Sequence, residues 1–305
     1  MSRTYRSILV PLDGSTVAEQ ALAVGASLAR RSGAILHLVS VQEPIPAAVT
    51  AEVGQYGMEL ERESRAELSR YLADTIETTR RAAPITLHGE LLEGHPADAI
   101  AQYVTDHGID LVVMTTHARK GLARWWLGSV GDRLLRRVSI PILLLHPSEL
   151  PQPTHFRRIL VALDGEIEDP VLDAATGLGG LEENAEYLLF RVAEPPVPLL
   201  TPLAASPSQL GQPHLARAME DAAAEYLDRV QRRLHAAGHK ASWRVVRSRD
   251  IPDQVVELAE ETGADCIVLG THGARGLERF LIGSVADKVV RSTALPVLVS
   301  PLAHR

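Results

Sequence analysis

Cysteine and long apolar runs are nearly missing from this chain of 305 residues. Cys266 is the one cysteine, so no intrachain disulfide can form, and its apolar neighbours predict an inert core residue. No apolar run approaches the roughly 20 residues that span a bilayer, and the run at 140–145 has only the length of a strand. No charged-then-apolar leader precedes the first apolar run. We therefore expect a cytoplasmic protein that has no membrane partner.

An excess of basic residues is also missing. The chain has 31 Lys and Arg against 38 Asp and Glu, which gives a net charge of -7. A polyanion-binding surface is therefore disfavoured and nucleic acid is not expected as a partner, although a single phosphate pocket is compatible with this balance. The chain has no G-x4-G-K-S/T run, and no G-x-G-x-x-G follows the first apolar run. A P-loop ATPase and a dinucleotide-dependent oxidoreductase are thus unsupported.

What the chain does contain is an internal duplication. Segment 110–145 returns as segment 265–300 with 14 of 36 positions identical, and the opening run 8–15 returns as 159–166. A repeat of about 150 residues has the size of a whole domain rather than of a solenoid unit. The sequence therefore predicts two like domains, at 1–147 and 157–305, joined by a proline-containing linker at 148–156.

Within each half, apolar runs of strand length alternate with segments whose apolar residues recur at helical spacing. The expected strands are 6–12, 35–41, 85–92, 111–115 and 140–146, and then 159–163, 187–192, 243–246, 266–270 and 296–300. Strands that are apolar throughout and alternate with helices indicate an α/β fold, in which a doubly wound parallel sheet is covered on both faces. Ligands of such sheets bind beyond the carboxyl ends of the strands, where the strand order reverses.

The best-matched residues of the two halves lie at two such strand ends. In the second half the loop after the fourth strand carries Gly270 and Gly273, and Gly283-Ser284 opens the next helix. Glycines let backbone N–H groups approach an anion, and a helix N-terminus adds free donors and a partial positive charge. This geometry suits phosphate. Asp164, after the first strand, could accept a hydrogen bond from an amino group or a ribose hydroxyl.

The spacing G-x2-G-x9-G-S/T, together with an aspartate at the end of the first strand, resembles the universal stress protein family in its tandem form. The resemblance covers nearly the whole chain. It implies two Rossmann-like, adenine nucleotide alpha hydrolase-like domains, each with a five-stranded parallel sheet of order 3-2-1-4-5 and helices on both faces. It also implies a stress-response binding or signalling module that holds ATP, or ADP or AMP, with or without Mg2+.

The resemblance transfers the family's nucleotide contacts by position. In the second half the adenine, ribose and phosphate contacts fall on Ala162, Asp164, Val192, Leu269, Gly270, Gly273, Gly283, Ser284 and Val285. In the first half the equivalents are Pro11, Asp13, Val41, Met114, Thr115, Ala118, Gly128, Ser129 and Val130. Thr115 and Ala118 replace both loop glycines, so nucleotide is expected mainly in the second half. Glu166 and Asp250 are acidic departures in the second half that would repel a triphosphate or hold a metal ion.

Simpler readings of the same residues stay open. Asp13 and Asp164 could cap the helices that follow them, and the glycine loop could be a plain connection. Two other functions also stay open: slow Mg2+-dependent hydrolysis of ATP, for which no catalytic base is identifiable, and a ligand-free stress scaffold. Because an uncovered sheet edge tends to pair, the last strands, 142–145 and 297–300, are expected to join the halves. A homodimer of the tandem chain is a further expectation.

Overall fold

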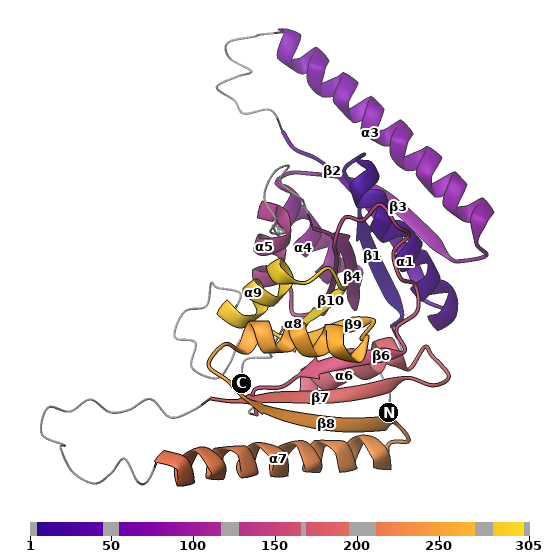
Figure 1. Ribbon diagram of the computed structural model, residues 1–305. Coiled ribbons are helices and arrows are strands. Elements are labelled where there is room, and N and C mark those ends of the chain that lie inside the picture. Colours follow the sequence, from indigo (N-terminus) through magenta and orange to yellow (C-terminus); the bar gives the residue numbers. More distant parts are fainter. Residues whose placement is uncertain are drawn as a thin grey trace, which may run out of the picture.

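The computed structural model describes residues 5–44, 55–116, 128–165, 169–194, 212–271 and 283–301. Its strands are β1 (Ser7–Pro11), β2 (Ile35–Gln42), β3 (Leu87–Glu93), β4 (Leu111–Thr115), β5 (Ile142–Leu145), β6 (Arg158–Ala162), β7 (Glu186–Ala193), β8 (Lys240–Arg247), β9 (Cys266–Gly270) and β10 (Val297–Ser300). Its helices are α1 (Thr16–Ser32), α3 (Gln55–Ala82), α4 (Pro96–Asp106), α5 (Gly128–Arg137), α6 (Asp169–Gly179), α7 (Gln212–Ala236), α8 (Ile251–Thr262) and α9 (Ser284–Ser292) (Figure 1).

Local signals set several of these helix ends. Helix α1 begins after Ser15, whose side chain accepts a hydrogen bond from the Ala18 amide, and it ends at Gly33 in the left-handed conformation with φ 70°. Proline stands in the first turn of both α4 and α8, where its missing N–H leaves no helical bond unmade. Helix α8 ends at Gly263, again in the left-handed conformation. Caps and prolines in the sequence thus account for these boundaries.

The ten strands form one sheet in the order β3-β2-β1-β4-β5-β10-β9-β6-β7-β8. Each half is parallel and has the order 3-2-1-4-5, as expected. The halves meet through an antiparallel pair of β5 and β10, in which Leu143 lies opposite Leu298. The predicted pairing of the last strands is therefore confirmed. In the part of the chain that the structure describes, β3 and β8 are the two sheet edges.

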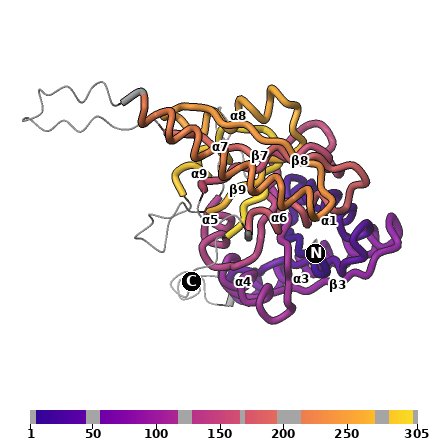
Figure 2. The backbone as a smooth tube through the Cα atoms, turned by 90° about the horizontal axis from the view of Figure 1, so that it is seen from below, coloured from indigo at the N-terminus to yellow at the C-terminus, as the bar shows by residue number. Residues whose placement is uncertain are grey.

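Helices cover both faces of this sheet, and each face carries one continuous apolar cluster. One cluster joins buried residues of α1, α3, α6 and α7 to the strands, and the other joins α4, α5, α8 and α9. The long helices α3 and α7 lie at opposite ends of the molecule (Figure 1). In the perpendicular view the half coloured indigo to magenta and the half coloured orange to yellow meet across the middle (Figure 2). Since both clusters draw on both halves, the two halves share their core.

The segment expected as a linker is bound to both halves rather than being a free tether. Gln20 of α1 exchanges two hydrogen bonds of 3.0 Å with the backbone of Ser148. Arg31, at the end of α1, donates to the Thr154 carbonyl, and Phe156 is completely buried. The proline content indicated a connection, but the sequence carried no signal for these long-range contacts.

Most of the expected strands have slightly different bounds in the structure, and two of the larger differences lie at the sheet edges. The strand expected at 85–92 begins at Leu87 and ends at Glu93, and the strand expected at 243–246 spans Lys240–Arg247. Both are edge strands with many exposed residues, so their polar positions weaken the apolar pattern from which strand limits are read.

Candidate functional site

The first strand of each half ends in an aspartate-glycine turn at the point where the strand order reverses. Asp13 and Asp164 are exposed and follow β1 and β6. Gly14 has φ 81° and Gly165 has φ 96°, a left-handed backbone that side chains with a Cβ adopt at a cost. The glycines therefore turn the chain sharply and leave the aspartates at the carboxyl edge of the sheet.

In the first half, Asp13 holds the turn together. Its Oδ1 accepts hydrogen bonds from the Ser15 amide at 3.0 Å and from the Ser15 hydroxyl at 2.6 Å. Ser15 in turn caps the amide of Ala18 at 3.1 Å. The alternative in which Asp13 itself caps α1 is therefore wrong, because Ser15 is the cap. Asp13 acts one step earlier, by orienting the capping hydroxyl.

In the second half, the predicted glycines lie at the end of strand β9 and at the start of helix α9. Strand β9 lies beside β6, so Gly270 and Asp164 both lie at carboxyl ends of adjacent strands. The Gly283 amide donates to the Thr271 carbonyl, which brings the start of α9 to the end of β9. Gly283 caps α9 without any side-chain hydrogen bond. Among the described residues, no capping side chain therefore covers the first amides of α9. Gly273 lies outside the described residues.

The apolar residues predicted as contacts share one layer. Ala162, Val192, Leu269 and Val285 all belong to the cluster on the α8–α9 face of the sheet. Leu269 is buried, and the other three are half-buried. In the first half Val41, Met114 and Val130 lie in the same layer. Half-buried apolar side chains beside a strand-end aspartate can cover one face of a flat heterocycle, while the polar groups at the edge fix its orientation.

In the first half, several of the predicted contacts lie at the ends of strands or at the start of a helix. Pro11 ends β1, and Gly128 begins α5 with φ 73°, followed by Ser129. Thr115, at the end of β4, is 5% exposed, and its Oγ1 has no hydrogen-bond partner among the described residues. A buried hydroxyl without a partner is costly, so a hydrogen-bonding group beside it would be stabilised. Ala118 lies outside the described residues, as does Glu166 in the second half.

The structure adds one residue that sequence reasoning missed. The Arg191 guanidinium, on β7, lies so close to Gly165 that a Cβ there would be 2.4 Å from its carbon. The same guanidinium stands 5.2 Å from the centre of the Tyr226 ring. Arg191 therefore brings a positive charge to the Asp164–Gly165 turn. Its sequence signal was a single charge inside the otherwise apolar run 187–193.

The sequence profile described as "Universal stress protein family" matches residues 4–146 and again residues 155–301. These matches cover nearly the whole chain. The fold and the pair of strand-end sites are thus those of a tandem α/β protein, and the chain belongs to the universal stress protein family.

Similar proteins cover the chain from end to end. Universal stress protein Rv2005c of Mycobacterium tuberculosis is 25% identical over 317 residues, which make up 98% of each protein. A crystal structure of a universal stress protein from Archaeoglobus fulgidus is 18% identical, covers 97% of this chain and 98% of its own, and has a TM-score of 0.68. A universal stress protein in complex with cAMP is 21% identical, covers 48% of this chain and 100% of its own, and has a TM-score of 0.35. Across the described residues, no helix combines the length and the apolar character needed to cross a bilayer.

Proposed function

We propose that this protein is an adenine-nucleotide-binding module that holds ATP, or ADP or AMP, mainly in its second half. The observation that carries the proposal is the hydrogen bond from the Gly283 amide, at the start of α9, to the carbonyl of Thr271, which follows Gly270 at the end of β9 beside the turn that carries Asp164. Family membership supports the proposal, since it gives both halves the same framework. A cytoplasmic location stays a prediction.

The groups at this site suit the parts of an adenine nucleotide. Within the described residues the amides at the start of α9 have no capping side chain, and the helix dipole adds a partial positive charge, so both favour phosphate. The exposed Asp164 carboxylate can accept a hydrogen bond from a ribose hydroxyl. Half-buried Ala162 and Val192 offer an apolar surface to adenine.

The first half is expected to bind more weakly. Thr115 stands there in place of Gly270, and the Asp13 carboxylate is already engaged by the amide and hydroxyl of Ser15. A ribose hydroxyl would have to share that carboxylate or displace one of these two hydrogen bonds. The buried Thr115 hydroxyl still leaves this half one group that a ligand would satisfy.

The proposal is tested by titrating the full-length protein with ATP, ADP and AMP in a calorimeter, after denaturing a sample and identifying any released nucleotide by mass. Asp164→Asn should weaken binding at least about tenfold, because a hydrogen bond to a charged group contributes roughly 1.5–3 kcal/mol. The matched change Asp13→Asn should alter the affinity of the main site by less than about twofold. Gly273→Ala combined with Gly283→Ala should weaken binding at least about tenfold, because the added methyl groups block close approach of the phosphate.

Two results would count against this function. If the wild-type protein shows neither heat nor a thermal shift with any adenine nucleotide, and releases none on denaturation, the ligand-free scaffold is favoured. If Asp13→Asn weakens binding more than Asp164→Asn does, the main site lies in the first half instead.

A further inference from the structure

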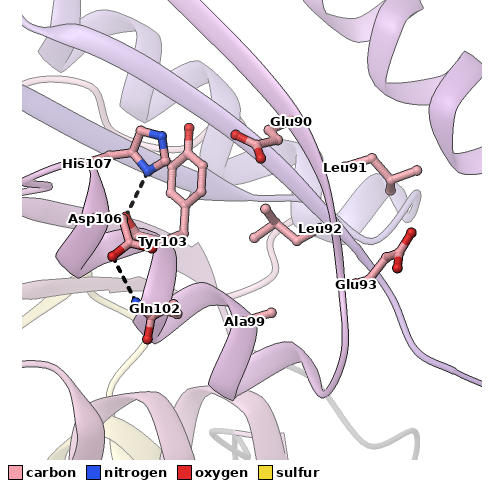
Figure 3. Close-up of a pocket in the computed structure, with 9 residues that line it drawn as sticks. All are labelled: Glu90, Leu91, Leu92, Glu93, Ala99, Gln102, Tyr103, Asp106 and His107. Carbon is pink, nitrogen blue, oxygen red and sulfur yellow. Dashed lines mark hydrogen bonds between the residues drawn. The ribbon is translucent and has the colours of Figure 1, made fainter.

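A pocket of about 380 Å³ opens between the edge strand β3 and helix α4 of the first half (Figure 3). None of the residues that line it is among the predicted nucleotide contacts. Leu92 and Ala99 contribute apolar surface, Tyr103 comes from α4, and His107 directly follows the end of that helix. This volume falls within the range of small-molecule sites.

The charge that lines this pocket is negative. Glu90, on β3, and Asp106, at the end of α4, both contribute to the lining, as does Glu93. Glu93 pairs with Arg65 of α3, and Asp106 accepts a hydrogen bond of 2.8 Å from the Gln102 amide. Within the described part of the chain, Glu90 makes no ion pair. In Figure 3 the Glu90 carboxylate points toward the side of the pocket where Tyr103 and His107 lie. Glu90 and Asp106 therefore line the pocket with no ion pair to either carboxylate among the described residues.

The two aromatic rings that line the pocket are fixed by stacking and by a buried hydrogen bond. The Tyr103 and His107 rings stack, with centroids 3.8 Å apart and an interplanar angle of 18°. The Tyr103 hydroxyl lies 2.9 Å from Nδ1 of the buried His37, and Nε2 of the same ring lies 3.0 Å from the Ser7 hydroxyl. A ring fixed on one side by stacking and at its tip by a buried hydrogen bond loses little freedom when a ligand contacts it.

At the corresponding position of the second half, the edge strand carries an arginine instead of Glu90. Val39 pairs with Glu90 in the first half, and its counterpart Phe190 pairs with Arg244, so an arginine stands where the first half has Glu90. On α8, Glu261 is the counterpart of Asp106, 155 positions earlier in the chain. Arg244 Nη1 lies 2.8 Å from Glu261 Oε2. A guanidinium thus binds the carboxylate at this place in one half and is missing in the other.

We propose that the pocket between β3 and α4 binds a small organic cation, a guanidinium or primary ammonium group on a short aliphatic chain. The cationic group occupies the place of the missing arginine, between Glu90 and Asp106. The aliphatic chain lies against Leu92 and Ala99, beside the Tyr103 and His107 side chains of the lining. The same chemistry belongs to a free amine or guanidine and to an arginine or lysine side chain of a partner protein.

The test is calorimetric titration of the full-length protein with n-butylguanidinium, compared with n-butylurea, its uncharged isostere. The wild type should bind the cation and not the urea. Glu90→Gln should weaken binding about two- to fivefold, the range expected of one exposed ion pair. Glu90→Arg should abolish binding, because the new guanidinium can pair with Asp106 as Arg244 does with Glu261. Glu90 is exposed, so both variants should fold.

The matched control is Glu261→Gln, which removes the corresponding carboxylate in the second half and should leave binding of n-butylguanidinium unchanged. Comparison of agmatine with the tripeptide Gly-Arg-Gly separates the two sources: tighter binding of agmatine indicates a free small cation, and tighter binding of the peptide indicates a side chain of a partner. The proposal is overturned if n-butylurea binds as well as the cation, if Glu90→Arg binds like the wild type, or if neither cation nor peptide binds.

Discussion

Two histidines are held neutral inside the protein. Burial, with smaller effects of His88 and His107, lowers the pKa of His37 from 6.5 to about 4. Burial also lowers the pKa of His146 from 6.5 to about 4. His37 is 5% exposed and His146 is 2% exposed, and the latter lies 3.2 Å from the Thr116 hydroxyl. Both rings therefore stay uncharged at neutral pH and serve as hydrogen-bonding core residues.

This predicts a loss of stability in mild acid. Between about pH 6.5 and pH 4 the unfolded chain binds a proton at each histidine and the folded protein does not, so the free energy of unfolding falls as the pH falls. Below that window both states are protonated and these groups cause no further loss. Urea unfolding of the wild type and of His37→Gln across this range should show a shallower pH dependence for the variant. The control His214→Gln changes an exposed histidine and should keep the wild-type slope. A slope of His37→Gln equal to that of the wild type would contradict the prediction.

The two aspartate-glycine turns offer a matched pair of glycine substitutions. Gly14→Ala should cost about 1 kcal/mol, the strain of a Cβ at φ 81°, because nothing lies within 4 Å of the new atom. Gly165→Ala should cost about 1 kcal/mol more, because the Arg191 guanidinium must leave the Tyr226 ring. Chemical denaturation measures both.

A second variant separates strain from contact at this turn. In an Arg191→Ala background, Gly165→Ala should cost no more than Gly14→Ala does in the wild type. If the cost of Gly165→Ala stays the same with and without Arg191, the contact between guanidinium and turn contributes nothing.

Among the strands, the pair β5 and β10 is the one that unites the sheet. Leu143, Leu144, Val297 and Leu298 are all fully buried in this pair. Residues that alternate along each strand enter the two apolar clusters on opposite faces. The pair therefore contributes to both layers of the core at once.

We expect Leu298→Ala to lower the free energy of unfolding by about 2–5 kcal/mol, as is usual when a large core side chain is truncated. The control Leu150→Ala, at a residue that is 76% exposed, should change it by less than about 0.5 kcal/mol. Guanidinium denaturation followed by circular dichroism gives both values. Similar values for the two variants would mean that the junction of the halves contributes little to stability.

One acidic side chain contacts several segments where the two halves meet. Glu182, in the second half, pairs with Arg31 of α1 and accepts hydrogen bonds from the His155 ring at 3.0 Å and the Phe156 amide at 3.1 Å. Burial alone would raise the pKa of this carboxyl, but the hydrogen bonds from His155, Phe156 and Arg31 outweigh it and lower the pKa. Glu182 therefore stays charged and binds the linker to both halves.

Removal of this carboxylate should destabilise the protein far more than removal of an exposed one. The Glu182 side chain is 5% exposed and the Arg31 side chain 15%, so Glu182→Ala leaves a largely buried charge unpaired and should cost about 3 kcal/mol. Glu93→Ala breaks the exposed pair with Arg65 and should cost less than about 1 kcal/mol. If urea titration shows that both variants lower the free energy of unfolding by the same amount, this role of Glu182 is refuted.

The two-domain repeat, the parallel sheets and the joining of the last strands all followed from the sequence. Periodic apolar runs decide which segments become strands and helices, and a duplicated pattern repeats the fold. The aspartates after the first strands and the glycines near the fourth were predicted as site residues for the same reason, because strand ends meet at one edge of a parallel sheet. The edge strands β3 and β8 were placed less well, because more than half of their residues are exposed.

Tertiary structure alone decided which side chains meet across long sequence distances. The contact of Arg191 with Gly165, the attachment of Glu182 to the linker, and the pocket between β3 and α4 with its acidic lining all join residues from separate elements. Periodicity and spacing report the environment along one segment only. Which charge faces which depends on how the packed elements are oriented, and that orientation is set by the core as a whole.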